Sequence, residues 1–413
     1  MKFFSCLFAL VVLGFSAVDT AFPQTGDDAG PGTITGISIT GLKRTKPHVA
    51  EGPLKKFIGR QAVDVDEVHA AILDAGILEP VSIEIGDAPE GDGKILNIEV
   101  REKWSIFPLP IVSVNSGGTS GGGFFVDTNA FGLNDKFVAG GLYGSGGWTA
   151  MLMYINTPDR EQFPGWTVGG MYSRQDREDT DQNEVVFRSF PLDSLKVFGG
   201  ISYPFLELFS ASLDISFNRL VIRDDPPEDG GAEAQAVGLN PGLSVSHSDW
   251  DGYLLSRQSV SLGYEYTIGI DFPDFQALSF QGIYEKSLIP GFRAAIHSGA
   301  LFAPGAPALF ESPPSAARVN ILPSGFSARH YGGVSMGLEK YLLKTSFGIL
   351  SILASYQLVY SWGPVLKDQW DHGVAGALSF YLSRLALPAM GLGLSYNVAA
   401  AYFQGYFNIG MSF

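Results

Sequence analysis

Apolar and polar residues alternate one by one in several stretches of this chain. The clearest is the C-terminal segment YFQGYFNIGMSF, at 402–413. One side of it carries apolar residues and one glycine: Phe403, Gly405, Phe407, Ile409, Met411 and Phe413. The other side carries Gln404, Tyr406, Asn408, Gly410 and Ser412. Because side chains on a strand point alternately to its two faces, the segment predicts a strand with one apolar and one polar face.

The same pattern recurs at 210–218 and 259–269. In the second stretch Val260, Leu262, Tyr264, Tyr266 and Ile268 alternate with small or polar residues. Alternation does not by itself say which face points inward, because a soluble barrel would place its apolar face inside and a membrane barrel outside.

Length and composition favour the membrane barrel. The chain has 413 residues, only 17% are charged, and no stretch after the N-terminus is a run of eighteen apolar residues. Lipid offers no hydrogen-bond partners to open sheet edges, so a membrane protein without helical spans must close its strands into a barrel. A net charge of −15 argues against a nucleic-acid partner.

The N-terminus reads as a targeting segment. Residues 1–21 begin with Lys2, continue through FFSCLFALVVLGF and end on small residues, as in a secretory signal peptide. Residues 22–31 read as a flexible linker. The only cysteine, Cys6, lies in the signal peptide, so the mature chain is expected to have no disulfide.

Residues 32–103 have the periodicities of a small α+β domain. We expect a first strand in ITGISIT, a helix over 46–58 that Gly52 and Pro53 weaken, and a second helix capped by Asp64 or Asp66. Two further strands are expected at 81–85 and 95–100, joined by the turn-rich DAPEGDG.

This order resembles a POTRA domain, the periplasmic module of outer-membrane assembly factors of the BamA/TamA type. The resemblance rests on GLKRTK at 41–46, D-x-D-E at 64–67, AGILEPV at 75–81 and LNIEVREK at 96–103. It implies one N-terminal POTRA domain, followed by a barrel over 104–413. At roughly nineteen residues per strand and turn, that length accommodates about sixteen antiparallel strands.

Two segments of the barrel region resemble the surface-antigen barrel of the same superfamily. FFVDTNAFGLND at 124–135 is similar to the start of that barrel. The segment 303–345 resembles its inward-folded loop, whose tip carries Arg-Gly-Tyr/Phe. Arg329 and Tyr331 match this tip, His330 stands in place of the glycine, and Gly332 follows.

The resemblance implies an acidic partner for Arg329. In the family, the loop arginine pairs with an aspartate in an aromatic-x-Asp-x-Gly motif, and the nearest counterpart here is VYSWG at 359–363, with Ser361 at the acidic position. A guanidinium inside a barrel needs carboxylate or carbonyl partners. Glu265 and Asp371 are therefore further candidates for anchoring the loop.

No pattern predicts catalysis, a cofactor or a metal site. Gly118–Gly122 fits G-x-S-x-G, but it lies in a glycine-rich run between strands, whereas a nucleophile elbow needs a strand-to-helix turn. The six histidines show no metal-binding spacing. The acidic segments 176–184 and 224–229 read as solvated surface loops.

The sequence thus predicts a mainly β protein of the bacterial outer membrane, with its POTRA domain in the periplasm. The resemblance implies an assembly factor, not an enzyme, that helps nascent β-barrel clients insert into the lipid bilayer, with periplasmic accessory proteins as candidate partners. POTRA strand addition and a weak seam between first and last strands would serve this role. The alternative is a pore that secretes a dedicated partner protein.

Overall fold

The computed structural model describes residues 32–74, 76–88, 93–156, 164–206, 208–224, 233–251, 254–289, 291–345, 348–364, 368–382 and 388–409. The expected signal peptide and linker lie outside these residues, as do Gly410, Met411 and Phe413 of the C-terminal segment and nearly all of 224–229. The chain divides into two compact units, one comprising the chain to Ser105 with Thr128–Asp135, the other comprising Ile106–Asp127 and Lys136–Phe413.

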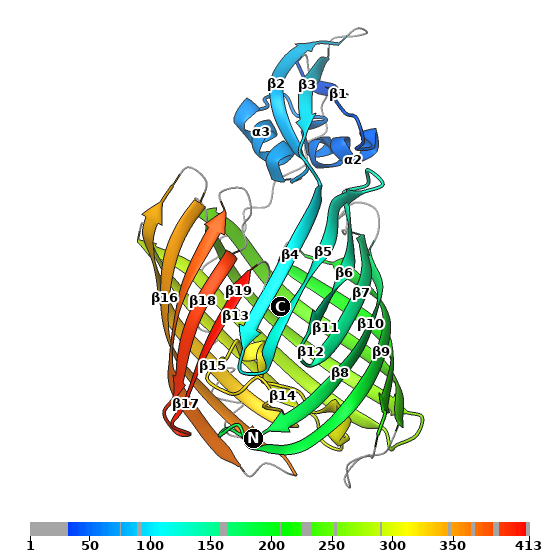
Figure 1. Cartoon of the computed structure of the whole chain (residues 1–413). Helices are drawn as coiled ribbons and strands as arrows, with labels where there is room; N and C mark the ends of the chain where they lie inside the picture. The colour runs from blue at the N-terminus through cyan, green and yellow to red at the C-terminus, as the bar shows by residue number, and fades with distance from the viewer. Residues whose placement is uncertain are drawn as a thin grey trace. The chain divides into compact units, whose positions relative to one another are not determined.

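The first unit is a small α+β structure, drawn in blue in Figure 1. Its elements are β1 (Ile34–Thr40), α2 (Pro47–Glu51), the 3-10 helix η1 (Gly52–Phe57), α3 (Val65–Asp74), β2 (Leu78–Asp87) and β3 (Lys94–Glu102). The sheet order is β1-β3-β2, with β3 parallel to β1 and antiparallel to β2. This confirms the small N-terminal α+β region; its assignment as a POTRA domain stays a prediction.

Local chemistry explains where its helices begin and end. The single helix expected over 46–58 is split into α2 and η1 at Gly52, beside Pro53, which has no N–H to continue the α-helical pattern. At α3 the carboxylate of Asp64 accepts the N–H of Asp66 at 2.9 Å, which satisfies a helix-terminal donor. The helices cover the sheet through a buried apolar core: Ile34, Ala50, Leu54, Phe57, Val68, Ala71, Ile72, Ile77, Leu78, Leu96, Ile98 and Val100.

The second unit contains a closed barrel of sixteen strands in the described residues (Figure 1), as the sequence predicts. They are β4 (Ile106–Asn115), β5 (Gly118–Ala130), β6 (Asp135–Gly144), β7 (Gly147–Asn156), β8 (Gly165–Thr180), β9 (Val186–Pro204), β10 (Phe209–Ile222), β11 (Glu233–Asp251), β12 (Leu254–Gly269), β13 (Phe275–Ile289), β14 (Phe292–Phe302), β15 (His330–Lys344), β16 (Gly348–Trp362), β17 (Gln369–Leu382), β18 (Pro388–Asn397) and β19 (Tyr402–Ile409). Each strand is antiparallel to its neighbours wherever a register is resolved, and β19 returns to β4 to close the barrel.

The apolar face of these strands points away from the barrel interior. On β10, Ile215 is 54% exposed while the adjacent Ser216 is 5% exposed. On β12, Leu262 and Ile268 are exposed, whereas Thr267 is buried. Alternation left the direction open, and the structure resolves it: small and polar residues face the lumen and apolar residues face outward.

No helix among the described residues is long and apolar enough to cross a membrane. The G-x-S-x-G match starts β5 directly after the turn at 116–117, so it is part of a β-hairpin and no helix follows its serine.

Candidate functional site: the inward loop and the seam

The connection between β14 and β15, residues 303–329, lies inside the barrel, and we call it the inward loop. Its backbone contacts β8, where Thr180 donates its N–H to the carbonyl of Gly325 at 2.9 Å. It also contacts β16, where the amide group of Gln357 donates to Oδ1 of Asn320 at 2.7 Å. Strands β8 and β16 are eight steps apart in the closed order of sixteen, on opposite walls. A segment that reaches both walls crosses the lumen.

The inward loop is packed rather than loosely coiled. It contains two short 3-10 helices, η2 (Ala308–Phe310) and η3 (Ser315–Ala317). Its last third forms a small apolar cluster with β16: Ile321, Leu322, Phe326, Ala328 and Val359. Such packing fixes the loop in one position in the lumen.

Two facing glycines make room for η3 against the barrel wall. Gly299 on β14 and Gly333 on β15 are a registered pair. A Cβ on Gly299 would meet the backbone of Ala316, and one on Gly333 would lie 3.1 Å from the Cβ of Ala317. The bare backbone at this pair therefore lets the loop approach closely.

A buried charge cluster anchors the first half of the loop to β8 and β9. We call it the Glu311 cluster, and its members are Arg177, Asp179, Arg188, Glu311 and Arg329. Nη2 of Arg188 lies 2.7 Å from Oε2 of Glu311, and its Nε lies 3.1 Å from Oδ2 of Asp179. The side chains of Arg188, Asp179 and Glu311 are 2–4% exposed. Arg177 also donates hydrogen bonds to the backbone carbonyls of Leu309 and Glu311.

This cluster corrects two expectations from the sequence. Residues 176–180 of the acidic segment belong to β8, and Asp179 is a buried ion-pair partner rather than part of a solvated loop. The acidic partner of Arg329 is Glu311, at 3.5 Å, and it lies within the same loop. The sequence argument considered only wall residues, so it missed a partner that the loop itself supplies.

The three wall candidates for pairing with Arg329 have other surroundings. Asp371 accepts from Gln369 and Asn397, each at 2.9 Å. Glu265 on β12 accepts from the hydroxyl of Thr267 at 3.0 Å. Ser361 is buried on β16, in register with Tyr331 of β15.

The tip motif divides between the two faces of the wall. Tyr331 shares the lumen side with Ser361, whereas His330 shares the outer face with its cross-strand neighbours Phe302 and Trp362. The His330 ring lies 4.9 Å from Phe302 and 5.1 Å from Trp362, centroid to centroid, and its Nδ1 accepts the N–H of Ala303. His330 thus belongs to an outer aromatic cluster. Gly332 pairs with Ala300 and Tyr360.

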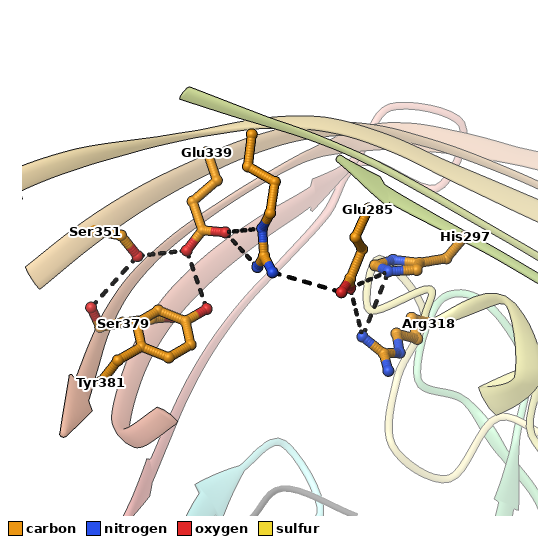
Figure 2. Close-up of polar contacts among 8 residues, drawn as sticks. Glu285, His297, Arg318, Glu339, Ser351, Ser379 and Tyr381 are labelled. Carbon is orange, nitrogen blue, oxygen red and sulfur yellow. Dashed lines mark hydrogen bonds and ion pairs between the residues drawn. The ribbon is translucent and has the colours of Figure 1, made fainter. Parts of the chain in front are cut away.

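A second buried network crosslinks the wall from β13 to β17 (Figure 2), and we call it the Glu339 network. Glu339 on β15 pairs with Arg293 of β14, and it accepts from Ser351 of β16 and, at 3.0 Å, from Tyr381 of β17. Arg293 also lies 3.5 Å from Glu285 on β13.

The Glu339 network reaches the inward loop through Arg318. Figure 2 shows Glu285 beside both His297 and Arg318. Oε1 of Glu285 lies 2.8 Å from Nε2 of His297 and 3.3 Å from Nη1 of Arg318. Gln281 on β13 adds a donation to the carbonyl of Ala316 at 3.3 Å. The loop therefore has charged attachments to two parts of the wall.

Fewer described residue pairs join β19 to β4 at the seam than join β4 to β5. In the described residues, three registered pairs join these strands: Phe407 with Val114, Asn408 with Ser113, and Ile409 with Val112. On its other side β4 makes ten registered pairs with β5. The predicted apolar face of β19 is confirmed for its described residues, because Phe403, Gly405, Phe407 and Ile409 share the face of the outward Tyr396, Leu394 and Leu392 of β18.

Two prolines remove N–H donors from the edge of β4 directly beyond its described pairs with β19. The two-residue turn at 116–117 makes Asn115 and Gly118 a hydrogen-bonded pair, so the odd-numbered residues of β4 bond to β5. The even-numbered residues then direct their nitrogens away from β5, to the edge that pairs with β19 at Val114 and Val112. Val114 and Val112 have N–H groups, but Pro110 and Pro108, the next positions on this edge, have none. Pro-x-Pro inside a strand is an edge signature that the sequence argument overlooked.

Among the described residues, no group of three or more His, Cys, Asp or Glu side chains is placed to hold a metal ion.

The comparisons with known proteins bear on the fold. No protein-family model and no curated protein matches this sequence. Among solved structures, BamA from Haemophilus ducreyi lacking POTRA domains 1–3 matches with a TM-score of 0.63 at 13% identity, over 94% of this chain and 86% of that one.

CdiB from Escherichia coli matches with a TM-score of 0.65 at 12% identity, over 92% of this chain and 77% of that one. CdiB from Acinetobacter baumannii gives 0.63 at 12%, over 92% and 74%. The fold is that of the BamA and CdiB barrels. At such identities the likeness to BamA and CdiB establishes the architecture, and the features of the loop and the seam rest on this chain's own contacts.

Proposed function

We propose that this chain is a bacterial outer-membrane assembly factor, which helps β-barrel proteins fold and insert into the membrane. The observation that carries the proposal is the β4 edge at the seam. Three described residue pairs close the barrel there and end at Val112, and the next two positions on the same edge of β4 are the prolines 110 and 108. A strand edge that lacks N–H donors forms fewer hydrogen bonds, so its neighbouring strand separates from it more easily. The separated strand can then pair with a strand of another protein.

The location follows from the outward face of the strands. Apolar residues such as Leu213, Leu243 and Leu262 are exposed on the outer face of neighbouring strands. A contiguous apolar outer surface suits hydrocarbon and not water. The proposal therefore places the barrel in the outer membrane and the first unit, as a POTRA domain, in the periplasm.

The sheet of the first unit fits the same role. Strands β1 and β2 are its two edges, since β3 lies between them. An edge strand presents main-chain donors and acceptors to an extended segment of a client protein, which binds by adding a strand. The proposal requires no catalytic residue and no cofactor.

A secretion pore for a dedicated partner protein is the second candidate. It is favoured by the position of the inward loop, because one segment crosses the lumen and its departure would widen the passage. Export requires that loop to break the buried Arg188–Glu311 pair, whereas assembly at the seam leaves it in place. We therefore rank assembly first.

Reconstitution separates the two candidates. The purified full chain is placed in liposomes with a trapped dye, and an unfolded β-barrel substrate is added outside. We expect the substrate to fold faster than in empty liposomes, without dye release. Unchanged substrate folding would overturn the assembly proposal, and dye release that needs a dedicated secreted partner would support the pore.

A further inference from the structure

We infer that segment 320–324 of the inward loop is a clasp that holds the seam closed from inside the lumen. The clasp consists of Asn320, Leu322 and Ser324 of the loop, Gln404 of β19, and Ser116 of the β4–β5 turn. These residues come from both sides of the seam and from the loop between them. Its opening would free β19 while the rest of the loop stays attached to the wall.

The first half of the clasp binds β19. The side-chain amide of Gln404 donates to the carbonyls of Asn320 and Leu322, the latter at 2.9 Å. Gln404 lies on the part of β19 that extends past the end of β4, since Phe407 is already in register with Val114 and β4 ends at Asn115. In the described residues this part of β19 is in register with β18 alone, so the loop supplies the hydrogen bonds that β4 does not reach.

The second half of the clasp binds the β4–β5 turn. The hydroxyl of Ser116 accepts the N–H of Ser324 at 3.2 Å and lies 3.2 Å from the hydroxyl of Ser324. The same Ser116 hydroxyl lies 3.3 Å from Oε1 of Gln404. Loop, turn and β19 thus meet at one point across the seam.

Neighbouring strands hold the clasp in position. Asn320 exchanges two hydrogen bonds with Gln357 of β16, at 2.7 and 2.8 Å, and its carbonyl accepts from Ser395 of β18 at 2.6 Å. These bonds attach Asn320 to the wall on the β19 side. The bonds to Ser116 are on the other side, and both Ser116 and Ser324 are exposed, so water can replace them when the seam opens.

Every bond of the clasp is between neutral groups. A neutral hydrogen bond contributes about 1 kcal/mol net, which corresponds to about fivefold in an opening equilibrium. This is strong enough to keep the seam closed and weak enough to be displaced by a strand that pairs with β19. The role as a gate for clients rests on the proposed function, whereas the clasp itself does not.

Amide hydrogen exchange of the full chain in lipid nanodiscs tests the clasp. Gln404→Ala and Ser116→Ala should each speed exchange of the β19 amides at 403–407 by about fivefold. The control is Gln281→Ala, which removes an amide–carbonyl bond to the same loop at β13, far from the seam. It should leave β19 exchange unchanged. Unchanged β19 exchange in both clasp variants, or an equal effect of the control, would overturn the inference.

A crosslink tests the clasp in the opposite direction. Ser116→Cys with Ser324→Cys, in a chain that also carries Cys6→Ser, should slow β19 exchange when oxidised and restore it when reduced. Oxidation without any slowing would also overturn the clasp. If clasp variants speed exchange while the liposome assay shows no client folding, the clasp stands and the assembly proposal fails.

Discussion

The wall from β13 to β17 and the seam between β19 and β4 are built from the same kind of strand but are held by different chemistry. The wall is crosslinked by the buried charges of the Glu339 network, and β8 and β9 hold the loop through the Glu311 cluster. The seam has three described residue pairs, two prolines and neutral hydrogen bonds. Buried ion pairs are costly to break, whereas neutral bonds next to water exchange readily. The inward loop is therefore fixed on one side and releasable on the other.

Arg188→Met should have the largest effect on this contrast. It leaves Glu311 and Asp179 buried without their main cation, at a cost of about 3–5 kcal/mol. We expect faster amide exchange in η2 and at 325–328. The control is Arg219→Met, because Arg219 and Glu233 are also 2.7 Å apart but exposed, and such pairs contribute at most about 1 kcal/mol. Equal effects of the two substitutions would contradict a charge-anchored loop.

Glu339→Gln should have the next largest effect. It removes the charge that faces Arg293 while keeping the size of the side chain and an acceptor for Ser351 and Tyr381. Arg293 keeps Glu285 at 3.5 Å, so we expect a loss of about 2 kcal/mol. Urea unfolding in lipid vesicles measures it, with Glu265→Gln as a lumen control that faces no arginine in the described contacts. A variant as stable as the parent would contradict a stabilising role of the Glu339 network.

Arg329→Ala should cost less than either change. Arg329 is 3.5 Å from Glu311 and its side chain is 21% exposed, and Glu311 keeps Arg188 when Arg329 is gone. We expect a loss of about 1 kcal/mol, seen as a small rise in loop exchange. A larger effect than that of Arg188→Met would mean that Arg329, and not Arg188, is the main residue that holds the inward loop in place.

Pro110→Val should strengthen the seam. It adds an N–H on the same edge of β4 as Val112 and Val114, at the next position past the described seam pairs, and valine suits a strand. We expect β19 amides to exchange about fivefold more slowly, as one added hydrogen bond implies. The control is Leu109→Val, whose nitrogen faces β5. Faster exchange in the Pro110 variant would mean that the proline is part of a well-fitted edge.

The sequence predicted the wall better than the loop for a physical reason. Strand faces follow from period-two alternation, which is local, so the segments at 210–218, 259–269 and 402–409 could be assigned residue by residue. The number of strands followed from length. Neither depends on which distant residues meet.

The loop contacts depend on the closed fold. Arg188 and Glu311 are 123 positions apart in the chain, and Ser116 and Gln404 are 288 apart. No local pattern pairs them. Arg329 could be singled out through resemblance, but its partner could not, and Asp179 looked solvated because acidic residues surround it in the sequence. The sequence argument considered Gly405 and Gly410 of the last strand as signs of a loose seam and overlooked the prolines at 108 and 110.

Locking the seam tests the central claim most directly. Ser113 and Asn408 are registered across it, so Ser113→Cys with Asn408→Cys should form a disulfide there; Ser355→Cys with Ala375→Cys does the same between β16 and β17. Both pairs are compared in the liposome folding assay. We predict that oxidation abolishes client folding for the seam pair, that reductant restores it, and that the wall pair stays active in both states. Full client folding with the seam crosslinked would contradict the account.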